Sequence, residues 1–69
     1  MSQNELVLNH LKEYGSLTSL EAMNLYGITR LAARISDLRR EGHHIIASTV
    51  EVPTRAGRTA RVARYRLCE

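Results

Sequence analysis

The sequence predicts a small α+β domain in which three helices are followed by a two-stranded β-hairpin. Two observations carry this prediction. Apolar residues recur at helical spacing across residues 3–42, and after Gly42 the pattern changes to short β-branched segments separated by a turn that contains Pro53 and Gly57. Because 69 residues leave room for one small core, we expect a single domain over residues 1–69.

The first two helices are expected over residues 3–14 and 19–25. Thr18 begins the second helix, because its hydroxyl group and the carboxylate of Glu21 have the spacing of a capping box. Gly27 then supplies a tight turn before the third helix, and two helices joined in this way form a helix-turn-helix pattern. The side chains expected to point inward in this region are Leu17, Leu20, Ala22 and Met23.

The third helix has the clearest amphipathic pattern in the chain. Leu31, Ile35 and Leu38 fall at i, i+4 and i+7, which places them on one side of an α-helix. We expect the hydroxyl of Thr29 to cap the first turn and Gly42 to close the last turn in a left-handed conformation. The residues expected on the opposite, outward side are Arg30, Ala33, Arg34, Asp37 and Glu41.

Two strands are expected over residues 44–52 and 60–67, with a turn over residues 53–59 between them. Alternation along the second strand places Ala63, Tyr65 and Leu67 on one face of the hairpin. Arg64 and Arg66 then lie on the other face.

Positive charge is concentrated in the second part of the chain. Residues 1–29 carry one lysine against three glutamates, a net charge of −2, whereas residues 30–69 carry nine arginines against four acids, a net charge of +5. Five of these arginines fall between Pro53 and Cys68, where there is no acid. Basic charge polarised in this way is typical of a surface that binds a polyanion, and the alternative is an ordinary solvated arginine surface.

The order of elements and the residues within them resemble the winged helix-turn-helix proteins, in particular the small phage and prophage type. The matching segments are residues 17–22, 27–35, 37–39, 42 and 63–67. The resemblance implies a DNA-binding fold in which the third helix is the recognition helix and the hairpin is the wing. It does not name a DNA target.

The candidate DNA-contacting residues of the third helix are Thr29, Arg30, Ala33 and Arg34. A helix with small and basic residues on its free face fits a DNA major groove, where arginine binds base edges or phosphates and alanine contacts a thymine methyl group. Ordinary surface pairing is the alternative for the two arginines. Asp37 would repel phosphate, so we expect it to orient Arg34 rather than to accept from a cytosine amino group.

Arg55 and Arg58 flank Gly57 at the expected wing tip, and Arg61 follows on the next strand. A basic loop of this kind follows phosphates or enters a minor groove, whose negative potential favours arginine. The alternative role is to keep the hairpin edge soluble and unpaired by charge. For Arg61, Arg64 and Arg66, extension of the DNA contact and simple solvation are equally compatible with the pattern.

The sequence offers little support for other chemistry. It contains no apolar run of roughly 18 residues and no signal-peptide pattern, and its lone Cys68 agrees with a reducing compartment, so we expect a cytoplasmic protein of a prokaryotic cell without a membrane partner. His43 and His44 lack further ligands at metal-binding spacing. We expect no catalytic residue, no metal and no cofactor, because no nucleophile, base and acid form a motif.

The sequence therefore predicts a double-stranded DNA-binding protein, a regulator of the phage or prophage type. The competing interpretation is a protein-interaction module that uses the same fold to dock to a host or phage protein. RNA is disfavoured as a ligand, because a helix does not fit the narrow major groove of A-form RNA. A homodimer, a larger nucleoprotein complex and a protein partner all stay open, since no zipper or dimer face is visible in the sequence.

Overall fold

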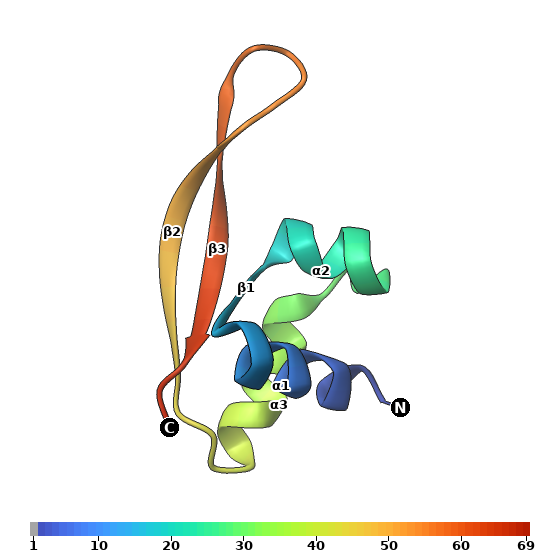
Figure 1. The fold of residues 1–69 in the computed structure, drawn as a ribbon, viewed down its shortest axis with the longest axis vertical. Helices are drawn as coiled ribbons and strands as arrows, with labels where there is room; N and C mark the ends of the chain where they lie inside the picture. The colour runs from blue at the N-terminus through green and yellow to red at the C-terminus, as the bar shows by residue number, and fades with distance from the viewer. Residues whose placement is uncertain (1) are drawn as a thin grey trace.

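The computed structural model describes residues 2–69. Three helices pack together on one side of a sheet, and a long hairpin extends beyond them (Figure 1). The projecting hairpin makes the molecule elongated, with dimensions of 39 × 22 × 20 Å. The elements in chain order are α1 (Gln3–Tyr14), β1 (Ser16–Thr18), α2 (Ser19–Tyr26), α3 (Leu31–Arg40), β2 (Ile45–Pro53) and β3 (Thr59–Leu67).

Local capping interactions determine where α1 and α2 begin. The Ser2 hydroxyl accepts a hydrogen bond of 3.2 Å from the backbone N–H of Glu5. The capping box of α2 is present as expected: the Glu21 N–H donates to Thr18 Oγ1 at 3.1 Å, and the Thr18 N–H donates to Glu21 Oε1 at 2.9 Å. All three hydrogen bonds satisfy backbone N–H groups that a helix terminus otherwise leaves unpaired.

The expectation that Thr29 caps the third helix is wrong. Helix α3 begins at Leu31, its N-cap position is Arg30, and no side chain caps it. The reason is that Ile28 is buried and its N–H bonds to the Ala22 carbonyl at 3.2 Å, so the chain leaves α2 in a fixed direction. Thr29 consequently lies in the turn, one residue before the N-cap.

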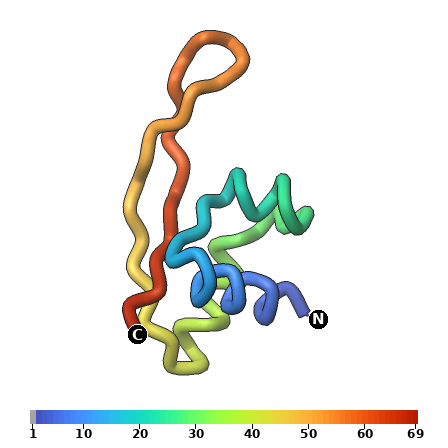
Figure 2. The backbone as a smooth tube through the Cα atoms, viewed as in Figure 1, coloured from blue at the N-terminus to red at the C-terminus, as the bar shows by residue number. Residues whose placement is uncertain are grey.

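The sheet has three antiparallel strands in the order β1-β3-β2, which corrects the expected two-stranded hairpin. Leu17 is completely buried and lies opposite Tyr65 in the register of β1 and β3. Burial of Leu17 therefore holds the segment before α2 in extended form beside the free edge of β3. The part of the hairpin beyond Thr18 has no third strand, and its two strands twist about each other as they project (Figure 2).

The core lies between the three helices and the lower half of the sheet. Helix α3 contributes the apolar stripe that the sequence predicts. In α2, however, Ala22 is the buried residue, whereas Leu20 and Met23 are exposed, which corrects the expectation for these two side chains. A small side chain at position 22 allows α2 to approach the core closely. The buried apolar residues are Val7, Leu11, Leu17, Ala22, Ile28, Leu31, Ile35, Leu38, Ile45 and Tyr65.

We expect Leu17→Ala to lower the free energy of unfolding by about 2–4 kcal/mol, because it opens a cavity in the core and removes the side chain that holds β1 against β3. The measurement is urea-induced unfolding followed by circular dichroism. Leu25→Ala is the matched control, since Leu25 is 60% exposed and its loss is expected to change stability by less than about 0.5 kcal/mol. Equal effects of the two substitutions would contradict this account of β1.

Candidate nucleic-acid interface

The outward side of α3 and the beginning of α1 form an open, polar hollow of about 530 Å³. All four residues predicted from the third helix lie around this hollow, although Thr29 and Arg30 reach it from the turn rather than from the helix. The residues that line it are Gln3, Thr29, Arg30, Ala33, Arg34, Ser36, Asp37 and Arg40.

Three of these lining residues, Gln3, Ser36 and Arg40, were not among those that the sequence singled out. Ser36 and Arg40 follow Ala33 at i+3 and i+7, so all three point away from the buried stripe of α3. The same periodicity that identified the stripe therefore contains the signal for its opposite face. Arg40 is also in the last turn of the helix, where a cation offsets the helix dipole, and that structural role accounts for its presence by itself.

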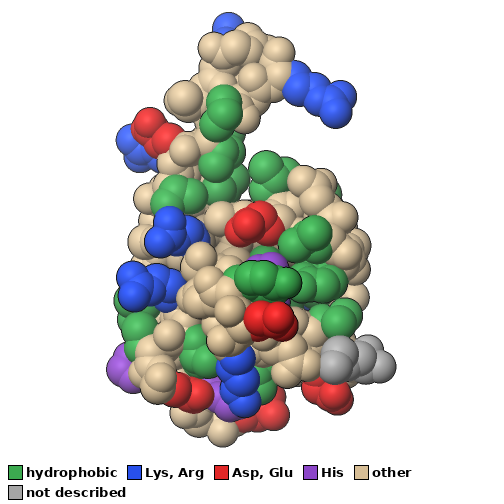
Figure 3. Space-filling view, in the orientation of Figure 1, with side chains coloured by type: hydrophobic (Ala, Val, Ile, Leu, Met, Phe, Trp, Pro, Cys, Tyr) green, Lys and Arg blue, Asp and Glu red, His purple; other side chains and the backbone are tan. Residues whose placement is uncertain are grey.

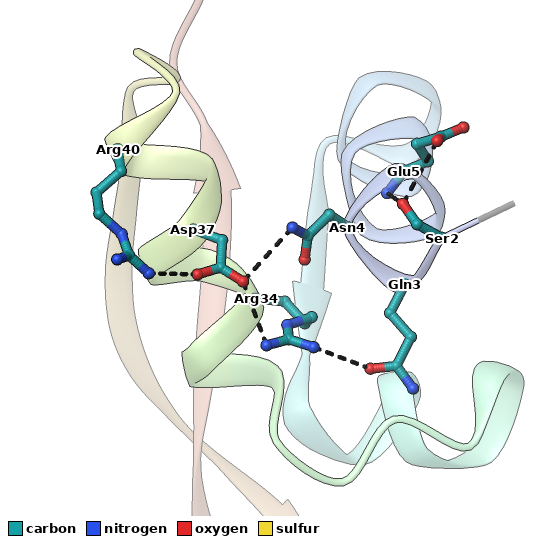
Figure 4. A network of polar contacts seen from close by, with 7 residues as sticks. All are labelled: Ser2, Gln3, Asn4, Glu5, Arg34, Asp37 and Arg40. Atoms are coloured by element: carbon teal, nitrogen blue, oxygen red, sulfur yellow. Dashed lines mark hydrogen bonds and ion pairs between the residues drawn. The ribbon is translucent and has the colours of Figure 1, made fainter.

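The predicted pairing of Asp37 with Arg34 is present and belongs to a wider network (Figure 4). Arg34 Nη2 lies 3.2 Å from Asp37 Oδ2, and Arg34 Nη1 donates to Gln3 Oε1 at 3.5 Å. Asn4 Nδ2 donates to Asp37 Oδ2 at 3.5 Å, and Arg40 pairs with Asp37 Oδ1. The network therefore connects the outward face of α3 with the beginning of α1, a contact between segments far apart in sequence.

Arg39, the neighbour of Arg40 in the last turn of α3, does not line the hollow and bonds to the backbone of the sheet instead. Its Nε and Nη2 atoms donate to the Ile45 carbonyl oxygen at 3.1 and 2.9 Å. The guanidinium group thus joins the last turn of α3 to the first residue of β2. These bonds fix the helix relative to the start of the hairpin.

None of the three arginines predicted at the hairpin lines the hollow. Arg55 and Arg58 are exposed in the turn between β2 and β3, which is closed by a hydrogen bond of 2.7 Å from the Thr54 N–H to the Arg58 carbonyl. Gly57 supports the turn with a φ of +74°. Arg61 lies further down the hairpin, 3.8 Å from Glu51, and basic side chains mark the projecting end in Figure 3. The structure therefore presents two basic regions, one on α3 and one on the hairpin.

The other ionisable side chains singled out in the sequence do not form a further site. His43 Nδ1 lies 2.8 Å from Glu69 Oε1, and Cys68 is exposed. Within residues 2–69, no group of three or more histidine, cysteine, aspartate or glutamate side chains is arranged to hold a metal ion. None of the helices described is long and apolar enough to cross a membrane.

A second hollow, of about 430 Å³, lies between α1, β1 and α2. Its buried member is His10, whose Nδ1 lies 2.7 Å from the Tyr26 hydroxyl and whose ring lies 4.7 Å from that of Tyr14. Hydrophobic side chains gather on this face of the molecule between acidic ones (Figure 3). The large apolar side chains exposed on α1 and α2 are Tyr14, Leu20, Met23 and Leu25.

The fold and its surface define a helix-turn-helix domain that carries a basic β-hairpin. A family model described as a winged helix-turn-helix domain matches residues 2–69, and the chain belongs to this family. In this domain, α2 and α3 form the helix-turn-helix, and the hairpin β2–β3 forms the projecting part of the wing. No curated protein and no solved structure matches the chain.

We expect Arg39→Ala to lower the free energy of unfolding by about 1–2 kcal/mol, because it removes two charge-assisted hydrogen bonds to the Ile45 carbonyl. Thermal or urea unfolding followed by circular dichroism measures the effect. Arg58→Ala removes an equal charge from the exposed wing tip and is expected to leave stability within about 0.5 kcal/mol of the wild type. If both variants lose the same stability, the loss is caused by the change in net charge and not by the missing hydrogen bonds to Ile45.

Proposed function

We propose that this chain binds double-stranded DNA, with α3 in the major groove and the wing on the adjacent backbone or minor groove. The observation that carries the proposal is the outward face of α3, where small side chains stand at the centre and exposed arginines at both ends. Such a face lets the helix approach base edges closely while guanidinium groups reach acceptors on either side. Membership of the winged helix-turn-helix family supports the same function.

Each residue around the hollow has a role in this proposal. Thr29 and Arg30, at the N-terminal end of α3, contact phosphate or a base edge, since a helix N-terminus favours anions. Ala33 approaches a thymine methyl group, and Arg34 contacts DNA from the position in which Asp37 and Gln3 hold it. Ser36 and Arg40 extend the contact along the groove.

The wing supplies the second set of contacts. Arg55 and Arg58 are exposed on the projecting turn, and the segment from Pro53 to Cys68 contains no acid to neutralise them. Arg61 adds charge nearer the body of the protein, where Glu51 partly offsets it. We further propose a role as a cytoplasmic regulator of the phage or prophage type, which rests on the resemblance of the sequence.

Titration of a labelled random-sequence duplex at several salt concentrations tests DNA binding directly. If five to six phosphates are neutralised, the logarithm of the binding constant is expected to fall with the logarithm of salt concentration at a slope of about −5. Heparin serves as a competitor that carries charge without base edges. Absence of binding at about 50 mM salt, where phosphate contacts are strong, would reject the proposal.

The double variant Arg30→Ala/Arg40→Ala tests the contribution of α3. We expect affinity for duplex DNA to fall about ten- to a hundredfold, because two guanidinium groups at the groove are lost. Lys12→Ala is the control, since Lys12 is an exposed cation on α1 outside the hollow. Equal losses from the double variant and the control would mean that α3 is not the contact surface.

The wing is tested by Arg55→Ala/Arg58→Ala. We expect the salt dependence to become shallower by about 1.8, at 0.9 per phosphate contact, with a similar loss of affinity on every duplex sequence. Thr59→Ala, an exposed substitution beside the same turn, is expected to leave both quantities unchanged. An unchanged salt dependence in the double variant would exclude the wing tip from the DNA contact.

Docking to a protein is the second candidate function, and the exposed apolar side chains of α1 and α2 are the observation that favours it. None of these apolar side chains lines the polar hollow on α3. A protein partner or a second copy of the chain that binds to them therefore leaves the hollow open to DNA. A folded chain that fails to bind DNA in the titration would favour this function over the first.

A further inference from the structure

Asp37 is the one carboxylate among the residues that line the hollow, and it pairs with two of the three arginines there. An acid in the middle of a DNA-contacting face opposes binding, because it repels the phosphates that the arginines attract. Its position therefore calls for a function that offsets the loss of affinity.

Both oxygen atoms of Asp37 are occupied within the protein. Oδ2 lies 3.2 Å from Arg34 Nη2 in an ion pair and accepts a hydrogen bond from Asn4 at 3.5 Å, while Oδ1 pairs with Arg40. Only 27% of the Asp37 side chain is exposed. These contacts leave Asp37 poorly placed to accept a hydrogen bond from a cytosine amino group. Its partners are the arginines themselves, as Figure 4 shows.

The two arginines are restrained to different degrees. The guanidinium group of Arg34 is bound at both ends, to Asp37 and to Gln3, and its side chain is 33% exposed. Arg40 is 77% exposed and is held by Asp37 across one turn of α3. A free arginine adapts its long side chain to phosphates on any sequence, whereas a restrained one contacts only an acceptor that lies at its fixed position.

We propose that Asp37 is a specificity-determining residue: by restraining Arg34 and Arg40, it weakens binding to DNA in general and increases discrimination between sequences. The proposal rests on the DNA-binding function proposed above. The acceptor pair that fits a restrained guanidinium group is the O6 and N7 edge of guanine, so the preferred duplex is expected to contain guanine at the contacted position. Asp37 acts through the arginines and is a positioning residue in this sense.

The test compares two dissociation constants, one for a random-sequence duplex and one for the duplex that the wild-type protein selects from a random library. For Asp37→Asn, an isosteric change, we expect about three- to tenfold tighter binding to the random duplex and a salt dependence steeper by about 0.9 for each arginine released. Discrimination, the dissociation constant for the random duplex divided by that for the selected duplex, is expected to fall at least threefold. A residue with a merely structural role would weaken binding to both duplexes instead.

Two further variants make the outcome decisive. Glu41→Gln removes the same charge from an exposed position just after α3 and is expected to change the random-duplex affinity by less than twofold. Asp37→Glu keeps the charge but displaces the carboxylate. It is therefore expected to lower discrimination without raising affinity for the random duplex. This variant replaces Asp37→Asn in the test if Asp37→Asn does not fold.

The proposal is overturned if folded Asp37→Asn binds the random duplex no more tightly than the wild type, or if Asp37→Glu preserves full discrimination. A wild-type protein that binds no duplex would reject the DNA-binding function itself. If the wild-type protein binds DNA and the Asp37 variants have the same affinity and discrimination, only the role of Asp37 is rejected.

Discussion

The structure depends on the burial of one side of α3. Leu31, Ile35 and Leu38 are almost completely inaccessible, and they form one core with the buried residues of α1, α2 and the sheet. In a helix with 3.6 residues per turn, burying these three positions leaves no choice about which residues face outward. The polar hollow is the geometric result, so the hydrophobic effect that stabilises the domain also sets the orientation of its basic side chains.

The connection between helices and wing rests on fewer groups. Leu17 brings the short strand β1 against β3, and Arg39 ties the end of α3 to the beginning of β2. The first contact is apolar and the second is a pair of charge-assisted hydrogen bonds, and they act on opposite edges of the sheet. Together they attach the base of the wing to the helical body, while the far end of the hairpin extends beyond the helices (Figure 1).

Sequence reasoning succeeded mostly where the determining interaction is local, although the local cap expected from Thr29 is absent. The capping box of Thr18 and Glu21, the stripe of α3 and the turn between β2 and β3 each depend on residues a few positions apart, and all three are present. It failed where a distant contact decides. Leu20 is exposed because Ala22 is the residue on the packed side of α2, and β1 pairs with β3 across about 50 residues of chain.

The same division holds for the candidate site. Ala33 and Arg34 line the hollow on the outward side of α3, as the helical period predicts, but the network of Arg34 also contains Gln3 and Asn4 from the beginning of α1. No spacing rule connects position 4 with position 37. The predicted pair of Arg34 and Asp37, three residues apart on one helix, is again the local part of the network.

The two hydrogen bonds from Arg39 to the Ile45 carbonyl have a consequence for the shape of a duplex bound as proposed. Because Arg39 joins the last turn of α3 to the start of β2, its hydrogen bonds help to set the distance and angle between α3 and the base of the wing in the free protein. For a duplex bound as proposed, the spacing between α3 and the wing must match the spacing of the neighbouring grooves that they contact. A duplex whose groove spacing does not match must bend or twist to fit, and the ease with which its base-pair steps deform becomes part of what the protein recognises.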